Sequence, residues 1–160
     1  MFKIKTIFLV TLLTFTSTFA HALEDKTCVV KATAGFQDSF FAPVRKALED
    51  LGYKPLVILE DNPETKAGEL WLMLNIVNTT TPDIVNDGCM VDNTFQATAH
   101  ISRVNIANTG LVLQTSGTDE FSRTIYDDTC TGNWVLPRDD ATAQEYVKAV
   151  QMLEKCEIKK

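Results

Sequence analysis

The chain has 160 residues, of which 45% are hydrophobic and 22% are charged, and its formal net charge is −6. This length and composition fit one globular domain with a modest core. Nucleic acids and anionic lipids are bound mainly by clustered Lys and Arg, and the sequence has no such cluster, so the acidic balance excludes both as expected partners.

The N-terminal residues have the pattern of a secretory signal peptide. Lys3 and Lys5 precede an apolar run from Ile7 to Phe15, and Ala20-His21-Ala22 supplies small residues for cleavage. A membrane anchor needs roughly 20 consecutive apolar residues, whereas threonines and a serine interrupt this stretch. We therefore predict that residues 1–22 are removed as a signal peptide.

Cleavage would leave one exported domain over residues 23–160, without a membrane span. It would remove two of the 15 Lys and Arg and none of the 21 Asp and Glu, so the net charge would change from −6 to −8. We expect this domain in the periplasm or in the secreted fraction.

Four cysteines remain after the predicted cleavage site. An even number of cysteines in an exported chain indicates disulfide bonds, and four cysteines allow three connectivities. No C-x-x-C pair is present, so the sequence suggests neither a thioredoxin-type redox site nor a zinc knuckle. We predict two disulfides: Cys28 with Cys156, joining the first strand to the last helix, and Cys89 with Cys130, joining two loops.

A strand, a helix and a second strand are expected at the start of the domain. The two strands are Thr27–Ala34 and Leu56–Leu59. Between them apolar residues recur at helical spacing, with Ser39 as the expected N-cap and Gly52 closing the helix. The apolar stripe of this helix consists of Phe40, Phe41, Val44, Ala47, Leu48 and Leu51.

The stretch from Glu69 to Ser116 predicts three strands in an antiparallel meander. Apolar residues alternate with others in Glu69–Asn78 and in Thr94–Ser102, and Gly110–Ser116 returns as the third strand. The residues expected to face the core are Leu70, Leu72, Leu74, Ile76, Phe95, Ala97, Ala99 and Ile101. His100 falls on the opposite, solvated face.

After Ser116 the hydrophobic period is lost, and we expect an irregular acidic segment with exposed aromatic side chains. A capping box at Thr142–Glu145 then begins a last helix. Because aromatic residues and Arg are enriched at interface hot spots, residues 121–137 form the predicted contact surface for a protein partner. The candidate partner-binding residues are Phe121, Arg123, Tyr126 and Trp134.

These elements predict the α+β class: a single domain with a mostly antiparallel sheet of four to five strands and two helices on one face. The expected order along the chain is β-α-β-β-β-β-α, and two disulfides staple the domain.

The sequence offers little support for catalysis. His100 is the only histidine after the signal peptide, and a solvated position on a regular strand gives it no evident partners for a Ser-His-Asp arrangement. No Gly-rich phosphate loop, H-E-x-x-H motif or calcium loop is present. We therefore expect no catalytic residue, no cofactor and no metal.

Two acidic pairs keep an enzymatic alternative open. Asp127-Asp128 and Asp139-Asp140 could supply the two carboxylates that glycoside hydrolysis requires. Asp139-Asp140 also precedes the last helix, where negative charge stabilises the helix dipole. That structural role is the favoured interpretation of the second pair.

One local motif resembles a group of bacterial envelope domains. Residues 105–113 contain a polar turn, Thr109-Gly110 and an apolar strand, and a helix over Thr142–Glu154 closes the domain. This arrangement resembles the amino-terminal domain of TolB and the similar domain of LpoB-type outer-membrane activators, over most of residues 28–153. Asn105 replaces the acidic residue common in that turn, and four cysteines replace a lipid anchor. The resemblance implies a non-enzymatic envelope protein that docks other proteins.

The sequence thus favours an exported, disulfide-stabilised, non-catalytic protein-binding module of the bacterial envelope or secreted fraction. The alternatives are a secreted effector or small hydrolase using an acidic loop site, and an enzyme inhibitor. A binding module should have a rigid apolar or aromatic patch, whereas an enzyme should have a pocket with convergent polar groups.

Overall fold

The computed structural model describes residues 28–59, 65–79, 83–85, 90–105, 110–126 and 135–157. The predicted signal peptide lies outside these ranges, as do Cys89, Cys130 and Trp134 and the acidic pair Asp127-Asp128. Within the described part of the chain, no helix is long and apolar enough to cross a membrane.

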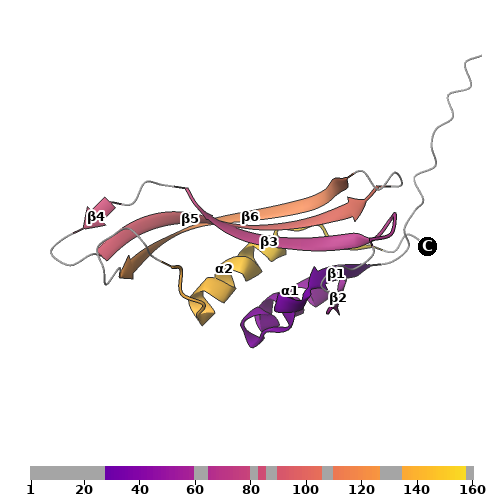
Figure 1. Ribbon diagram of the computed structural model, residues 1–160, viewed down its shortest axis with the longest axis horizontal. Coiled ribbons are helices and arrows are strands. Elements are labelled where there is room, and N and C mark those ends of the chain that lie inside the picture. The colour runs from indigo at the N-terminus through magenta and orange to yellow at the C-terminus, as the bar shows by residue number, and fades with distance from the viewer. Residues whose placement is uncertain are drawn as a thin grey trace, which may run out of the picture.

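The domain is α+β, as the sequence predicted. Two helices lie on the same side of a sheet, and the long strands extend beyond them toward β4 (Figure 1). Two short 3₁₀ turns, Ala34–Gln37 and Ser39–Phe41, connect β1 to α1. The elements are β1 (Val29–Thr33), α1 (Ala42–Asp50), β2 (Lys54–Ile58), β3 (Leu70–Asn78), β4 (Asp83–Val85), β5 (Met90–Val104), β6 (Leu111–Tyr126) and α2 (Asp140–Gln151).

The sheet has six strands and is mixed, which corrects the predicted four to five mostly antiparallel strands. Its spatial order is β2-β1-β3-β5-β6, and β4 pairs with the start of β5. β1 is parallel to both β2 and β3, whereas the pairs that involve β5 are antiparallel. The predicted element order missed β4, because a three-residue strand is too short to show a period.

The predicted faces of the meander are confirmed. Leu70 and Leu72 are 5% and 7% exposed, whereas Met73, which follows Leu72 and faces the helix-free side, is 42% exposed. Phe95, Ala97, Ala99 and Ile101 of β5 are almost completely buried. Ala97, Ala99 and Ile101 belong to the same core cluster as the apolar residues of α1 and α2, which include Val44, Leu48, Val147 and Val150.

β6 is much longer than predicted, and the expectation of an irregular chain after Ser116 was wrong. The strand continues to Tyr126 and pairs with β5 along its length. Its core-facing positions include Thr115 and Gly117, which are buried without being large or apolar. A strand with such residues on its inner face shows no hydrophobic alternation, so its period was invisible in the sequence.

One of the two predicted disulfides is confirmed. Cys28 at the start of β1 is bonded to Cys156 after α2, with their Cα atoms 5.9 Å apart. The backbone N–H of Cys156 donates to the carbonyl of Leu51, so the C-terminal segment is held to the end of α1 as well. The second predicted pair, Cys89 with Cys130, lies outside the described residues.

The first helix begins later than predicted: its N-cap is Phe41, without a side-chain hydrogen bond, and not Ser39. A 3₁₀ turn precedes it and is capped by Asp38. The carboxylate of Asp38, not the Ser39 hydroxyl, accepts a hydrogen bond from the backbone N–H of Phe40. The chain then makes a 3₁₀ turn before α1 begins at Ala42. Gly52 follows the helix with φ of 86°, in the left-handed region that favours glycine.

Candidate functional site

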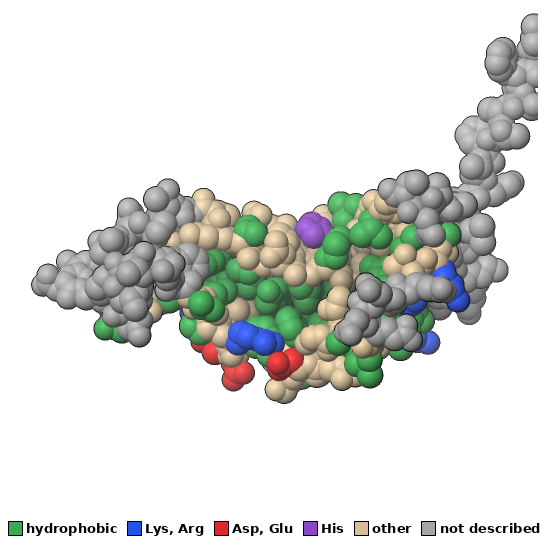
Figure 2. All heavy atoms as spheres, in the orientation of Figure 1, with side chains coloured by type: hydrophobic (Ala, Val, Ile, Leu, Met, Phe, Trp, Pro, Cys, Tyr) green, Lys and Arg blue, Asp and Glu red, His purple; other side chains and the backbone are tan. Residues whose placement is uncertain are grey.

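An apolar groove lies on the helix side of the sheet, where the long strands extend past the helix ends. Hydrophobic side chains gather in a hollow beneath these strands, and charged side chains border it below (Figure 2). The groove has a volume of about 310 Å³, near the lower end of the range for ligand sites. Its lining consists of Phe40, Phe41, Ile76, Asn78, Phe95, Val135, Leu136, Arg138, Thr142 and Tyr146.

Five parts of the chain build this groove, one of them the segment before α2 with Val135, Leu136 and Arg138. β3 and β5 contribute Ile76 and Phe95, the turn before α1 contributes Phe40 and Phe41, and α2 contributes Tyr146. The helices do not extend beneath this end of the sheet (Figure 1). Ile76 is only partly buried there, whereas Phe95 is 1% exposed and forms the floor of the groove. The groove is therefore a continuation of the hydrophobic core to the surface.

Aromatic side chains give one wall of the groove a defined shape. The ring centroids of Phe40 and Phe41 are 4.8 Å apart with an edge-on orientation, and Phe41 lies 5.7 Å from Tyr146. Such contacts stabilise aromatic pairs by about 0.5–1.5 kcal/mol beyond their buried area. Burial raises the pKa of Tyr146 above its usual range, so its hydroxyl stays neutral at physiological pH.

Arg138 forms the charged rim of the groove. Its guanidinium lies 4.9 Å from the ring centroid of Phe40 and 3.0 Å from a carboxylate oxygen of Asp38. The backbone N–H of Phe40, followed by Arg138, lowers the pKa of Asp38. Arg138 thus contacts both the ring of Phe40 and the carboxylate of Asp38. These two contacts link the aromatic wall to its charged rim at the solvent-facing side of the groove.

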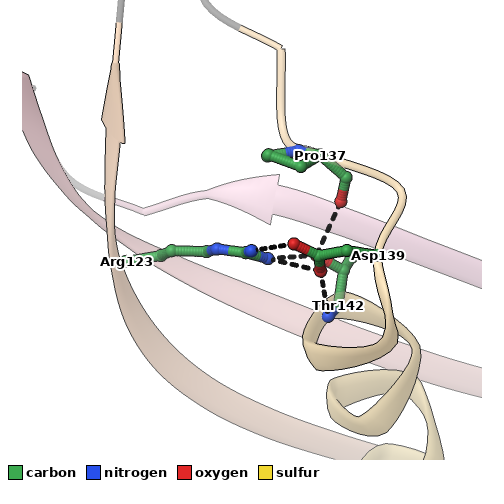
Figure 3. Close-up of polar contacts among 4 residues, drawn as sticks. All are labelled: Arg123, Pro137, Asp139 and Thr142. Carbon is green, nitrogen blue, oxygen red and sulfur yellow. Dashed lines mark hydrogen bonds and ion pairs between the residues drawn. The ribbon is translucent and has the colours of Figure 1, made fainter.

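A second polar cluster holds the segment that borders the groove. Arg123 extends from β6 toward the start of α2, where it pairs with Asp139 and also donates to Thr142 (Figure 3). The carboxylate of Asp139 accepts from the backbone N–H of Thr142 at 2.9 Å, and the Thr142 hydroxyl donates to the carbonyl of Pro137. These contacts position residues 137–142 and therefore the neighbouring Leu136 and Arg138.

The N-cap of α2 is Asp139, which corrects the capping box predicted at Thr142–Glu145. Thr142 lies within the first turn and is buried, with its hydroxyl used by Arg123 and Pro137. The hydrogen bond from Arg123, assisted by the N–H of Thr142, holds the pKa of Asp139 far below its usual range. The same hydrogen bond raises the pKa of Arg123. Both groups stay charged at physiological pH.

The structure places the predicted partner-binding residues in different environments. Phe121 is half-buried and its ring stacks on Phe95 at 5.4 Å, while Arg123 is occupied by Asp139. Tyr126, in contrast, is 65% exposed at the end of β6. Trp134 lies outside the described residues. The predicted segment thus supplies both structural contacts and exposed groups, and Val135 and Leu136 at its end line the groove.

His100 lies on the helix-free face, as predicted, between Met73 of β3 and Ser116 of β6. Its Nδ1 atom is buried and has no hydrogen-bond partner. Among the described residues, no group of three or more His, Cys, Asp or Glu side chains could hold a metal ion.

A charged and aromatic cluster occupies the same face. Lys31 pairs with Glu69 at 2.5 Å and lies 5.7 Å from the ring centroid of Trp71. Burial alone would raise the pKa of Glu69, but hydrogen bonds from Lys31 and from the backbone of Lys66 lower it overall. The cluster therefore holds β1 against β3 at the parallel end of the sheet.

Sequence reasoning missed the aromatic wall. Phe40 and Phe41 were both assigned to the buried stripe of one helix, although adjacent helical residues point about 100° apart. Two consecutive aromatic residues just before Pro43 were the signal that one of them lies outside the core stripe. Structurally they belong to the turn that precedes α1.

Comparison of the sequence with protein-family models and with curated proteins gives no match. Among solved structures, a minor lipoprotein from Acinetobacter baumannii is 10% identical, with a TM-score of 0.33. That match covers 81% of this chain and 95% of the lipoprotein chain. A similarity at this level carries no conclusion about function, so the resemblance to TolB-type and LpoB-type domains stays a prediction.

Proposed function

We propose that the protein is an exported, non-catalytic protein-binding module of the bacterial envelope or secreted fraction, and that it binds its partner through the aromatic groove. The observation that carries this proposal is the groove itself, with Phe40, Phe41 and Tyr146 forming one wall and Arg138 its rim. Aromatic residues and Arg in partly buried hollows are the usual hot spots of protein interfaces.

The shape of the groove supports binding of a protein side chain. It is open along one side and is lined there by Val135, a large apolar residue that is 83% exposed. A partner that inserts an apolar side chain between the wall and the strand ends would exclude water from these surfaces. The surrounding polar contacts already hold the wall in place, so little ordering accompanies binding.

The charged groups around the groove support binding rather than acid-base chemistry. Arg138 is paired with Asp38, and Asp139 is paired with Arg123 and caps α2. A general acid or base needs a carboxyl or imidazole that can exchange protons near neutral pH. Asp139 does not meet that requirement because its pKa is far below its usual range. Asp139 belongs to the acidic pair Asp139-Asp140 that was considered for glycoside hydrolysis. Its structural role is instead to cap the N-terminus of α2.

The proposed export rests on the sequence and on the disulfide. Structural disulfides form and persist in oxidising compartments, and Cys28–Cys156 joins the two ends of the described domain. This agrees with the predicted signal peptide over residues 1–22.

Site-specific photo-cross-linking in cells of the native host tests the proposal. A benzophenone amino acid at Val135 should give a discrete cross-linked species, whereas the same residue at Leu59 should not. Both positions are exposed and apolar, but only Val135 borders the groove. The species should disappear when Phe40→Asp is combined with the probe at Val135 and persist with Phe40→Leu. Equal cross-linking at both positions, or none at Val135, would contradict groove binding.

A further inference from the structure

Met73 and His100 lie directly opposite each other on the helix-free face of the sheet. The register of β3 and β5 pairs these two residues, and the alternation of each strand turns both side chains away from the helices. Met73 is 42% exposed. Residues directly opposite in an antiparallel pair have Cβ atoms about 4.5–5.5 Å apart. The thioether and the imidazole are therefore neighbours at an accessible position.

The imidazole of His100 lacks a partner. Its Nδ1 atom is buried without a hydrogen bond, so Ser116, its neighbour on β6, does not donate to it. His100 makes no hydrogen bond or ion pair with any residue that the structure describes. Buried polar atoms in folded proteins almost always have a partner, and an exception calls for an explanation such as a bound ion. The exception here lies opposite a methionine.

Met73 has no packing role that accounts for its position. It belongs neither to the hydrophobic core cluster nor to the partly buried residues packed against that cluster. Of the four methionines in the chain, Met1 belongs to the predicted signal peptide, and Met73, Met90 and Met152 are all exposed. Only Met73 is paired with an imidazole across two strands, because His100 is the only histidine of the predicted exported domain.

We propose that Met73 and His100 form a binding site for Cu(I), with the thioether sulfur and the imidazole Nδ1 as ligands. Thioether sulfur is a soft ligand that selects Cu(I), and imidazole is also a good ligand for copper. The ion gives Nδ1 the partner that it lacks. The site lies on the opposite face of the sheet from the aromatic groove, so it goes beyond protein binding.

The spacing of the two strands suits a cation between the side chains. Metal bonds to sulfur and to imidazole nitrogen are about 2.3 Å and 2.0 Å long in zinc sites. A cation with similar bonds, placed in line between its ligands, separates the two ligand atoms by about 4.3 Å. Opposed Cβ atoms are spaced almost equally, and side chains in strands stand roughly perpendicular to the sheet. The unbranched side chain of Met73 can therefore bring its sulfur to the cation by rotation alone.

The surrounding side chains favour a soft monovalent ion over a hard one. The nearest positions on this face of β3 and β5 include Trp71, Asn75 and Thr98, which are uncharged. Calcium and magnesium require oxygen ligands, mainly carboxylates, and these positions supply none. Lys31, beside Trp71, is paired with Glu69 at 2.5 Å, so its charge is compensated. One thioether and one imidazole form a different kind of site from the groups of His, Cys, Asp and Glu that the described residues lack.

Titration with Ag(I), followed by NMR of the methionine methyl groups and the histidine ring, tests the site. Ag(I) is a soft monovalent cation like Cu(I) and needs no reductant, so the Cys28–Cys156 disulfide stays intact. Treatment with N-ethylmaleimide beforehand blocks any free thiol. We expect the methyl signal of Met73 and the ring signals of His100 to shift together, with one half-saturation concentration. The methyl signals of Met90 and Met152 should require a concentration about tenfold higher or more.

Met73→Leu keeps a hydrophobic side chain of similar size and removes the sulfur. It should raise the Ag(I) concentration that half-saturates the His100 signals by about tenfold or more, since even the supporting groups around a metal contribute about 10–100-fold to its affinity. Met90→Leu, at a methionine of similar exposure, is the matched control and should leave that concentration unchanged. The proposal is overturned if the three methyl signals titrate together, if the His100 signals do not respond, or if Met73→Leu has no effect.

A second titration separates the proposed ion from the probe. Cu(I), added without oxygen as its acetonitrile complex, should displace Ag(I) and shift the signals of the same two residues. Zn(II) at the same concentration should not displace Ag(I), because a thioether is a poor ligand for a harder ion. Bound Ag(I) that Cu(I) leaves in place, or that Zn(II) displaces equally well, would contradict a Cu(I) site.

Discussion

Arg123 and Asp139 join β6 to the start of α2, and the pair has a defined pH dependence. Asp139 has a folded-state pKa well below the unfolded value of about 3.9. Its stabilisation is therefore fully present above that unfolded value and is lost as the pH falls toward the folded pKa. Because both side chains are partly exposed, the pair contributes on the order of 1 kcal/mol.

Asp139→Asn should lower the free energy of unfolding by about 1 kcal/mol at neutral pH, since Asn still caps a helix but carries no charge. The difference from the wild type should shrink as the pH falls below about 4. Urea denaturation at several pH values measures this. Asp140→Asn, in the same first turn but without an ion pair among the described residues, is the control and should have a smaller effect. A difference that stays constant down to pH 2 would contradict the account.

Gly117 is the residue where helix and strand approach most closely. Gly117→Ala places a methyl group against the Ala149 carbonyl, so we expect a loss of about 3 kcal/mol or more in the free energy of unfolding. Gly35→Ala is the matched control, because no atom lies within 4 Å of the added Cβ and its φ is not in the left-handed region. Thermal denaturation of the two variants compares them. Equal transition temperatures would mean that α2 does not lie directly on β6.

At the scale of the element, β3 tests the assignment of the two sheet faces. Leu72→Asp should prevent folding, because an unpaired buried carboxylate costs several kcal/mol, comparable to the total stability. Met73→Asp, one residue along the same strand and exposed, should fold. Circular dichroism distinguishes the two outcomes, and folding of Leu72→Asp with loss of Met73→Asp would show that the faces are inverted.

His100→Ala is the complementary test on β5. We expect a change of about 0.5 kcal/mol or less, as for a surface strand residue. The buried Nδ1 atom has no hydrogen-bond partner, so removing the imidazole loses no described hydrogen bond at that atom. A chemical denaturation midpoint that falls as far as that of a core variant would assign His100 a structural role.

The elements that the sequence predicted correctly are those with a clear hydrophobic period. β3 and β5 alternate large apolar residues with others, and α1 and α2 have apolar stripes, so their faces could be read directly. β6 could not, because threonine and glycine occupy its inner positions where α2 approaches. The groove could not be predicted either, since its wall depends on how far the helices extend beneath the strands. That distance is a property of packing between elements.

At the scale of the whole molecule, the disulfide closes nearly the full described domain. Cys28 and Cys156 are 128 residues apart, and a loop of this length implies a stabilisation of about 4–5 kcal/mol on the chain-entropy model. Replacing both cysteines with serine should lower the free energy of unfolding by roughly that amount. Urea denaturation under oxidising conditions measures the difference. An unchanged midpoint would show that the bond does not reduce the conformational entropy of the unfolded chain.

The predicted second disulfide, Cys89 with Cys130, has its own test. Protein from an oxidising compartment should show no thiol that reacts with an alkylating reagent under denaturing conditions. Peptide mapping without reduction should then recover both pairs. Alkylation of two cysteines per chain, with Cys28–Cys156 intact, would show that Cys89 and Cys130 do not form a disulfide.

The most direct test of the central claim is calorimetric titration of the cross-linked partner, once it is identified, against groove variants. Phe40→Ala should weaken binding by about 2 kcal/mol or more while circular dichroism stays unchanged. Tyr126→Ala combined with Trp134→Ala tests the contact segment predicted from the sequence separately, and should have the same effect if residues 121–137 also contact the partner. Leu59→Ala should bind as the wild type does. Full affinity in a folded Phe40→Ala variant would contradict groove binding and direct attention to the solvated face over Thr94–Ser102.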